Sequence, residues 1–126
     1  MKRDRIRYHH VGIPTSEVRV GEYFLPEHGV HVSGHENDVF GIEWMRYEVD
    51  SPLPELVKTK PHIAFKVEDL NAALEGHEIL IPPNSPSEGV RVAFIVHDGA
   101  PVEFLEFDPG HPDRLPAREA GENGSS

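Results

Sequence analysis

The sequence contains no cysteine, no long apolar run and few basic residues. Without cysteine, disulfides and thiolate ligands are excluded, so a bound metal would have to be held by nitrogen and oxygen donors. No segment stays apolar over the ~20 residues that a membrane-spanning helix needs, and the charged start leads into no signal-peptide-like stretch. The 22 acidic residues outnumber the 12 basic ones, and the net charge of -10 disfavours nucleic acid and anionic membranes as partners. We therefore expect a cytoplasmic protein that binds a small molecule.

The length bounds the architecture. A chain of 126 residues has enough material for one folded core. From Asp108 onward the chain consists mainly of proline, glycine, charged and small polar residues, which bury too little apolar surface to offset the entropy of ordering them. We predict a single domain over residues 1–109 and a flexible tail over residues 110–126.

Two segments of the first half recur, in the same order, in the second half. Residues 8–13 (YHHVGI) correspond to residues 60–65 (KPHIAF), and residues 41–47 (GIEWMRY) correspond to residues 101–107 (PVEFLEF). Each half therefore offers a histidine near its first strand and a glutamate in its last. Histidine and carboxylate side chains commonly hold catalytic divalent metals. The repeat predicts a metal site formed by His10 and Glu43 from one half and His62 and Glu103 from the other.

Hydrophobic patterning and turn residues predict similar elements in both halves. In the first half we expect strands over 5–13, 28–33 and 39–49, a helix over 17–25 capped by Thr15 or Ser16, and a proline-rich connection over 50–56. In the second half we expect a strand over 62–67, a helix over 68–74, a strand over 77–81, a loop over 82–89, and a hairpin of 90–97 with 101–107. The first half is shorter, which leaves room for one fewer strand.

Strand alternation sorts the neighbours of the two histidines. Ile63, Phe65 and Val67 would face the following helix, so His62 would point to the opposite face with Ala64. By the same alternation, His10 would share a face with Tyr8 and Gly12. Small residues beside each histidine leave space over that face, as a ligand cup requires.

Other residues compete for the same roles. The chain has nine histidines, and a one-residue register error would exchange His10 with His9. His28, His31 and His35 have no counterpart in the second half, so we interpret them as surface or strand-edge residues. Core or cup-lining positions are expected for Met45, Tyr47 and Phe107.

The four motifs together resemble the vicinal oxygen chelate superfamily, which includes glyoxalase I, methylmalonyl-CoA epimerase, fosfomycin-resistance proteins and extradiol dioxygenases. The residues that carry the resemblance are 10–13 (HVGI), 62–70 (HIAFKVEDL) and 102–106 (VEFLE). The resemblance implies an α+β fold in which two βαβββ modules, about 5–50 and 60–108, form a cupped sheet, with the first module abbreviated. It places the metal ligands on His10, Glu43, His62 and Glu103. Glu48 is an alternative to Glu43, although it lies on the opposite strand face.

The resemblance also implies a chemistry. The cofactor would be a divalent metal ion (zinc, nickel, cobalt, manganese or iron), and a substrate with neighbouring oxygens would lose a proton to give an enediolate, with Glu103 or Glu43 as the base. This predicts a lyase or isomerase of glyoxalase/epimerase type, in a homodimer that completes the sheet or the cup. The alternatives are a metal-dependent dioxygenase, which would need iron and would not need Glu43, and a non-catalytic binding protein. The basic residues are scattered and indicate no site for an anionic conjugate.

Overall fold

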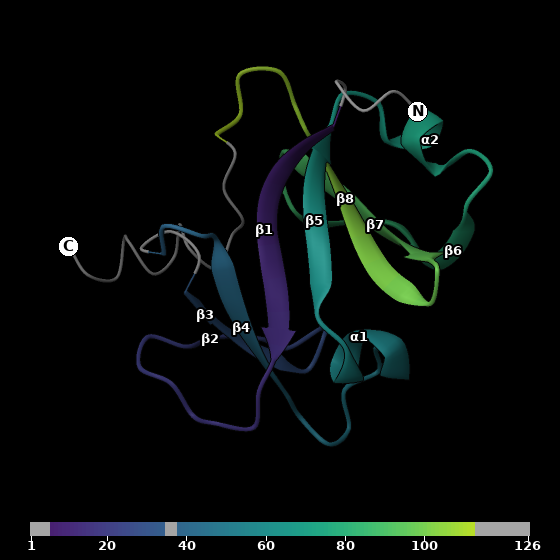
Figure 1. Cartoon of the computed structure of the whole chain (residues 1–126). Coiled ribbons are helices and arrows are strands. Elements are labelled where there is room, and N and C mark those ends of the chain that lie inside the picture. Colours follow the sequence, from purple (N-terminus) through teal and green to yellow (C-terminus); the bar gives the residue numbers. More distant parts are fainter. Residues whose placement is uncertain (1–5, 35–37, 113–126) are drawn as a thin grey trace.

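The computed structural model describes residues 6–34 and 38–112, which form one mixed sheet with two short helices (Figure 1). The elements are β1 (Ile6–Pro14), β2 (Tyr23–Leu25), β3 (Val30–Gly34), β4 (Ile42–Tyr47), α1 (Glu55–Thr59), β5 (His62–Val67), α2 (Leu70–Leu74), β6 (Glu78–Ser87), β7 (Val90–His97) and β8 (Ala100–Phe107). The predicted α+β class is confirmed. Most of the predicted tail lies outside the described residues.

The sheet is built from two halves with the same strand order. The eight strands follow the order β2-β3-β4-β1-β5-β8-β7-β6. The first strand of each half pairs in parallel with the last strand of the same half, β1 with β4 and β5 with β8, and β1 meets β5 antiparallel at the centre. Figure 1 shows β1 and β5 side by side, with the two halves curling away on either side. This is the cupped sheet of paired modules that the family resemblance implies.

Helix α2 covers the outer face of the second half. The Asp69 side chain accepts a hydrogen bond from the backbone N–H of Ala72 (3.1 Å), which caps the first turn. Leu70 and Ala73 then pack on Phe104 in the largest apolar cluster among the described residues. The chain leaves the helix at Gly76, whose φ of 77° favours glycine. Burial of a side chain such as that of Leu70 contributes about 1.5–3 kcal/mol.

The helix predicted over 17–25 is wrong. The Thr15 hydroxyl accepts a hydrogen bond from the Glu17 N–H (3.1 Å) and forms a turn, and Gly21 adopts a φ of 82°, which no helix allows. Val18 and Val20 are exposed, so the segment has no apolar face that could hold a helix against the sheet. Its last three residues instead form β2, which pairs with β3.

The expectation of one fewer strand in the first half is also wrong. Each half has four strands, and the first half lacks the counterpart of α2. Helix α1 was missed because prolines dominate the connection between the halves. Pro54 stands just before its first turn, where proline needs no hydrogen-bond donor, and buried Val57 anchors the helix. The hydroxyl of Ser51 donates to the His28 carbonyl (2.6 Å) and ties this connection to the first half.

The loop predicted over 82–89 belongs largely to β6, and the strand predicted over 39–49 is shortened to β4. The β6–β7 pairing shifts register three times, between Ile79 and Ile81, Ile81 and Asn84, and Asn84 and Ser87. β6 lies at the edge of the sheet, where prolines are tolerated because one side of the strand needs no donors. The prolines therefore mark an irregular edge strand and not a loop.

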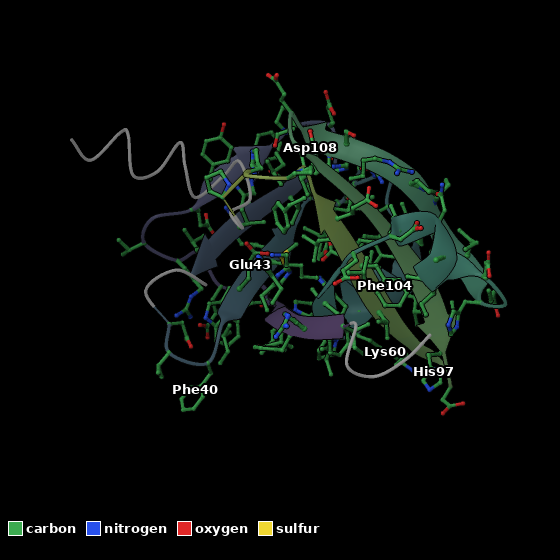
Figure 2. The ribbon with its side chains drawn as sticks, turned by 90° about the horizontal axis from the view of Figure 1, so that it is seen from above. Phe40, Glu43, Lys60, His97, Phe104 and Asp108 are labelled. Atoms are coloured by element: carbon green, nitrogen blue, oxygen red, sulfur yellow. The ribbon has the colours of Figure 1, made fainter. Side chains whose placement is uncertain are left out.

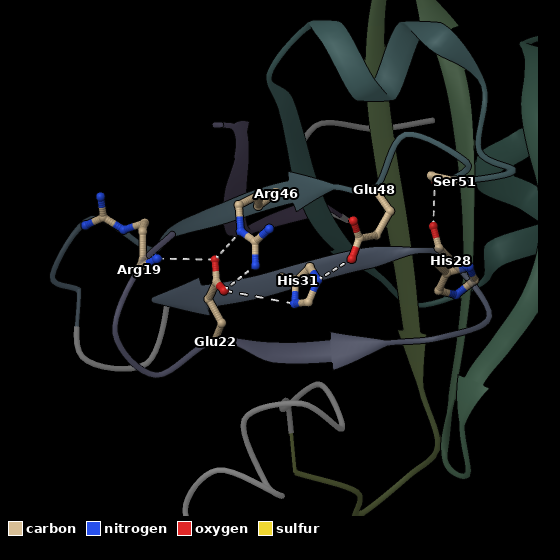
Figure 3. A network of polar contacts seen from close by, with 7 residues as sticks. All are labelled: Arg19, Glu22, His28, His31, Arg46, Glu48 and Ser51. Carbon is tan, nitrogen blue, oxygen red and sulfur yellow. Dashed lines mark hydrogen bonds and ion pairs between the residues drawn. The ribbon is translucent and has the colours of Figure 1, made fainter. Parts of the chain in front are cut away.

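A polar network lies on the sheet of the first half, where a helix was expected (Figure 3). The Arg46 guanidinium donates two hydrogen bonds to Glu22 (2.7 and 2.8 Å), and His31 contacts Glu48 (2.8 Å). The hydrogen bond from Arg46 lowers the pKa of Glu22 to about 2. The Arg19 guanidinium lies 4.5 Å from the centre of the Trp44 ring. His31 is therefore part of an ion-paired network and not a simple surface residue.

None of the helices in the described ranges is long and apolar enough to cross a membrane.

Candidate metal centre

A β-bulge in β1 sets the direction of the first histidine. The ladder with β5 pairs Tyr8 with Phe65 and His10 with Ala64, so His9 is the extra residue between them. From Tyr8 to His10 the pairing moves two residues along β1 but one residue along β5. Tyr8 and His10 therefore face opposite sides of the sheet. The prediction that Tyr8 shares the face of His10 is wrong. The Tyr8 hydroxyl instead donates to the Phe40 carbonyl (2.6 Å).

The central strands place the two histidines symmetrically. In the β1–β5 ladder, His10 pairs with Ala64 and Gly12 pairs with His62, one position on either side of the Val11–Ile63 pair. On the outer side of each small residue comes a glutamate, Glu43 opposite Gly12 and Glu103 opposite Ala64. Two rows across the sheet therefore each contain one histidine, one small residue and one glutamate.

The four predicted residues meet in the interior. His10 Nε2 lies 3.3 Å from Glu103 Oε1 and 3.6 Å from Glu43 Oε1, and His62 Nε2 lies 3.2 Å from Glu103 Oε1. All four side chains are buried, with exposed fractions of 1–7%. Glu48 lies apart and contacts His31. The structure thus brings Glu43, and not Glu48, to the group of His10, His62 and Glu103. The roles of these residues stay predictions.

Glu103 is held as a carboxylate. Burial opposes its ionisation, but hydrogen bonds from His10 and His62 outweigh burial and hold the pKa of Glu103 well below its usual range. Charge-assisted contacts of this kind are stronger than neutral hydrogen bonds. Glu103 therefore offers an anionic oxygen between two imidazoles.

His9 contacts the site from behind, which sequence reasoning missed. Its Nδ1 lies 2.7 Å from Nδ1 of His10, so one ring must donate and the other accept. For a metal to bind at His10 Nε2, that atom would have to give up the proton that it donates to Glu103, and His10 would then keep its proton on Nδ1 and donate it to His9. The only sign in the sequence was the doubled histidine itself. The Nδ1 atom of His62, by contrast, is buried without a hydrogen-bond partner.

A cavity of about 100 Å³ opens over the glutamates. Glu43, His62 and Glu103 line it, and in Figure 2 Glu43 points into the interior, whereas Phe40 and His97 lie at the periphery. Met45 and Tyr47 line the cavity as predicted, and Phe107 packs against a core cluster. Burial, together with the charges of Glu103 and Glu43, raises the pKa of Tyr47. The Tyr47 phenol therefore remains a hydrogen-bond donor at neutral pH.

Other lining residues were not expected. His28, placed on the surface by sequence reasoning, lines the cavity, as do Val57 of α1 and Asn84 of β6. All three belong to segments whose structure was predicted wrongly or incompletely. Their positions could not be derived without the correct path of the chain.

The donor set fits a divalent metal. One donor atom from each of His10, His62 and Glu103 lies within 4.8 Å of the others. Two ligands bound at about 2.1 Å in a tetrahedron lie about 3.4 Å apart, close to the 3.2–3.3 Å between Glu103 and the histidines. Nitrogen and carboxylate donors suit zinc, iron, cobalt, nickel and manganese. This buried His-His-Glu group is therefore able to bind a metal ion, whose identity the donors do not select.

A cupped sheet of paired modules, with histidines from the first strands and glutamates from the last strands at its floor, is the architecture that the vicinal oxygen chelate resemblance implies. No family model and no curated protein matches the sequence. The structure is similar to that of hypothetical protein BH1468 from Bacillus halodurans C-125, with a TM-score of 0.62, 22% identity, and coverage of 80% of this chain and 94% of that one. It is also similar to methylmalonyl-CoA epimerase from Mycobacterium tuberculosis, with a TM-score of 0.56, 21% identity, and coverage of 81% and 88%. The chain therefore has the vicinal oxygen chelate fold, and the resemblance is confirmed at that level.

Proposed function

We propose that this protein is a divalent-metal-dependent lyase or isomerase of glyoxalase/epimerase type, acting on a small substrate with neighbouring oxygen atoms. The position of Glu43 carries the proposal. Its carboxylate is buried, lines the cavity and lies 3.6 Å from His10, yet the compact His-His-Glu group is complete without it. A carboxylate beside a metal centre, and not needed to form it, is suited to proton transfer.

The residues would divide the work as follows. His10, His62 and Glu103 would hold the ion, which would polarise a substrate carbonyl and stabilise the charge that develops when the adjacent carbon loses a proton. Glu43 would take that proton and return it to the neighbouring carbon on the same side of the enediolate, whereas epimerisation would need a second proton donor on the opposite side. Glu103 would be the poorer base, because its carboxylate would already hold the ion together with the two histidines. The similarity in fold to a methylmalonyl-CoA epimerase supports this class of reaction.

A dioxygenase is the second candidate. Two histidines and one carboxylate are the ligand set of many non-haem iron oxygenases, and the compact group has this composition. Such an enzyme would need iron and would not need Glu43. The cytoplasmic location and the homodimer expected from the sequence stay predictions.

The first test is elemental analysis of the purified protein beside His62→Ala and Glu103→Ala. We expect a stoichiometric divalent metal in the wild type and loss of metal in both variants, since each removes one donor. His97→Ala is the matched control, because His97 is exposed at the periphery (Figure 2). Stoichiometric metal in both site variants would refute the proposed metal centre.

The second test separates the two reactions. Glu43→Gln keeps the shape of the side chain but cannot accept a proton. With 2-hydroxyketones and 2-oxo acids in D₂O, the wild type should exchange the hydrogen beside the carbonyl for deuterium, as followed by proton NMR, and the variant should retain metal but not exchange. Unchanged exchange would remove Glu43 from the role of base. Oxygen consumption by the iron-loaded variant at the wild-type rate would favour the dioxygenase.

A further inference from the structure

The walls of the cavity are made of hydrocarbon from both halves of the molecule. Val30, Val32 and Met45 of the first half and Ile81, Val92 and Phe94 of the second half line it. Val30 and Val92 are buried, and all the strands that form these walls lie within the described residues. A substrate group lying between them would lose its water and gain only apolar contacts.

Positive charge is scarce around this cavity. Among the described residues that line it there is no lysine or arginine, and His28 is the single lining residue outside the metal group that can carry a positive charge. Two carboxylates, Glu43 and Glu103, lie at the floor. A carboxylate or a phosphate lying among the apolar walls, away from the proposed metal, would lose its water without meeting a compensating cation.

Four basic side chains make contacts with other parts of the molecule. Arg46 is held by Glu22, and Arg91 by Glu106. Lys58 donates to the Ser51 carbonyl (3.2 Å) and contacts Glu55 (3.1 Å), and Lys60 donates to the Gly99 carbonyl (3.4 Å). None of these four residues lines the cavity.

We infer that the substrate of the proposed reaction carries a short, uncharged hydrocarbon group beside its chelating oxygens, and no anionic group in the part that lies among the apolar walls of the cavity. The inference rests on the proposed function and adds the substrate class. An apolar cavity of about 150 Å³ accommodates benzene, so about 100 Å³ accommodates a group of roughly four carbon atoms. A branched four-carbon chain matches the space and the walls.

The test compares two acids that differ only at the tail. 2-Hydroxy-4-methylpentanoate and malate share neighbouring oxygens, and an isopropyl group in the first replaces a carboxylate in the second. Calorimetric titration of the zinc-loaded protein should show binding of the first at least about tenfold tighter. Its two methyl groups become buried, whereas malate would place its second carboxylate among the apolar walls. Equal or tighter binding of malate overturns the inference, and so does the absence of binding to protein that holds one equivalent of zinc.

A cavity variant supplies the control. Met45→Lys places an ammonium group among the apolar walls and should abolish or reverse the preference, whereas Met45→Leu should keep it; thermal melting verifies that both variants fold. Preference for the hydrocarbon tail unchanged in Met45→Lys would place binding outside the cavity and overturn the inference.

Failure of the proposed function gives a different pattern. If the protein holds no zinc, the proposed metal centre fails, and the cavity is tested in the metal-free protein with 3-methyl-1-butanol and 3-hydroxypropanoate. The alcohol, and not the acid, should shift the methyl NMR signals of Val32, Met45 and Val92. Shifts from the acid alone, from both compounds or from neither overturn the inference on substrate class.

Discussion

The approach of His62 to Gly12 makes one substitution unusually informative. A Cβ atom added at Gly12 would lie 2.2 Å from His62 Cε1 and 2.7 Å from its Nε2. Ordinary contact begins at 3.4 Å, so in Gly12→Ala the imidazole must retreat by about 1.2 Å. His62 is only 2% exposed and lies against Phe94, with ring centres 5.0 Å apart, so the ring can retreat only by repacking against Phe94 or by moving into the cavity that it lines.

The expected cost has a structural and a functional part. Overpacking of a buried site destabilises by about 1–3 kcal/mol, which for a domain of this size lowers Tm by roughly 4–12 °C. Ligand distances in metal sites hold within about 0.2 Å, far less than the required retreat. Gly12→Ala should therefore lose most of its bound metal, as elemental analysis would show, and the NMR signals of the His62 ring should shift.

Gly76→Ala is the matched control. It makes the same chemical change at a position where a Cβ meets nothing within 4 Å, but where φ is 77°. We expect a loss of about 1 kcal/mol from the unfavourable φ and wild-type metal content. If Gly12→Ala binds metal as the wild type does, or leaves the His62 signals unmoved, the argument from close approach is refuted.

Three further outcomes are expected. His9→Ala should weaken metal affinity about 10- to 100-fold in chelator competition, because His10 loses the partner of its Nδ1, and His9→Asn should restore part of it. The pKa of Glu22 is about 2 in the folded protein against an ordinary 4.5. The contact with Arg46 therefore stabilises the folded state fully above pH 4.5, and this stabilisation is lost as the pH falls toward 2. Glu22→Gln should flatten the dependence of Tm on pH in that range, and an unaltered dependence would contradict the assignment. Leu70→Ala should cost about 2–5 kcal/mol in denaturant unfolding, because Leu70 is the fully buried residue that α2 packs on the sheet; a cost below 1 kcal/mol would contradict its place in the core.

The second half of the fold could be predicted because its local signals agree with its packing. Residues 62–67 alternate, and Asp69 and Gly76 bound the following helix with residues suited to those ends. The Asp98-Gly99 pair has positive φ at both positions, which suits the tight hairpin turn between β7 and β8. Local preference and tertiary contact therefore lead to the same structure.

The first half shows where such reasoning fails. Residues 17–25 contain a capping residue and a spacing compatible with a helix, but only Leu25 finds apolar partners, in the cluster of β3 and β4. Pairing with β3 then outweighs a helix that would bury little. In β6, prolines indicate a loop because the sequence does not reveal that this strand lies at an edge. Both errors concern the position of a segment in the sheet, which only long-range pairing determines.

The repeat predicts the backbone positions of the site, and the side chains around them differ between the halves. The pairings Glu43–Gly12 and Glu103–Ala64 are equivalent, so symmetry alone would give both glutamates the same role. Glu103 nevertheless contacts both histidines, whereas the contact of Glu43 is with His10 at the longer distance of 3.6 Å. The bulge at His9 lies in β1 where it pairs with β5, whereas the pairing of β5 with β8 is regular, and the bulge places a second imidazole behind His10. A duplicated module thus supplies two carboxylates at equivalent backbone positions, and the proposed division of roles, with Glu103 as a ligand and Glu43 as the base, rests on how differently their side chains approach the histidines.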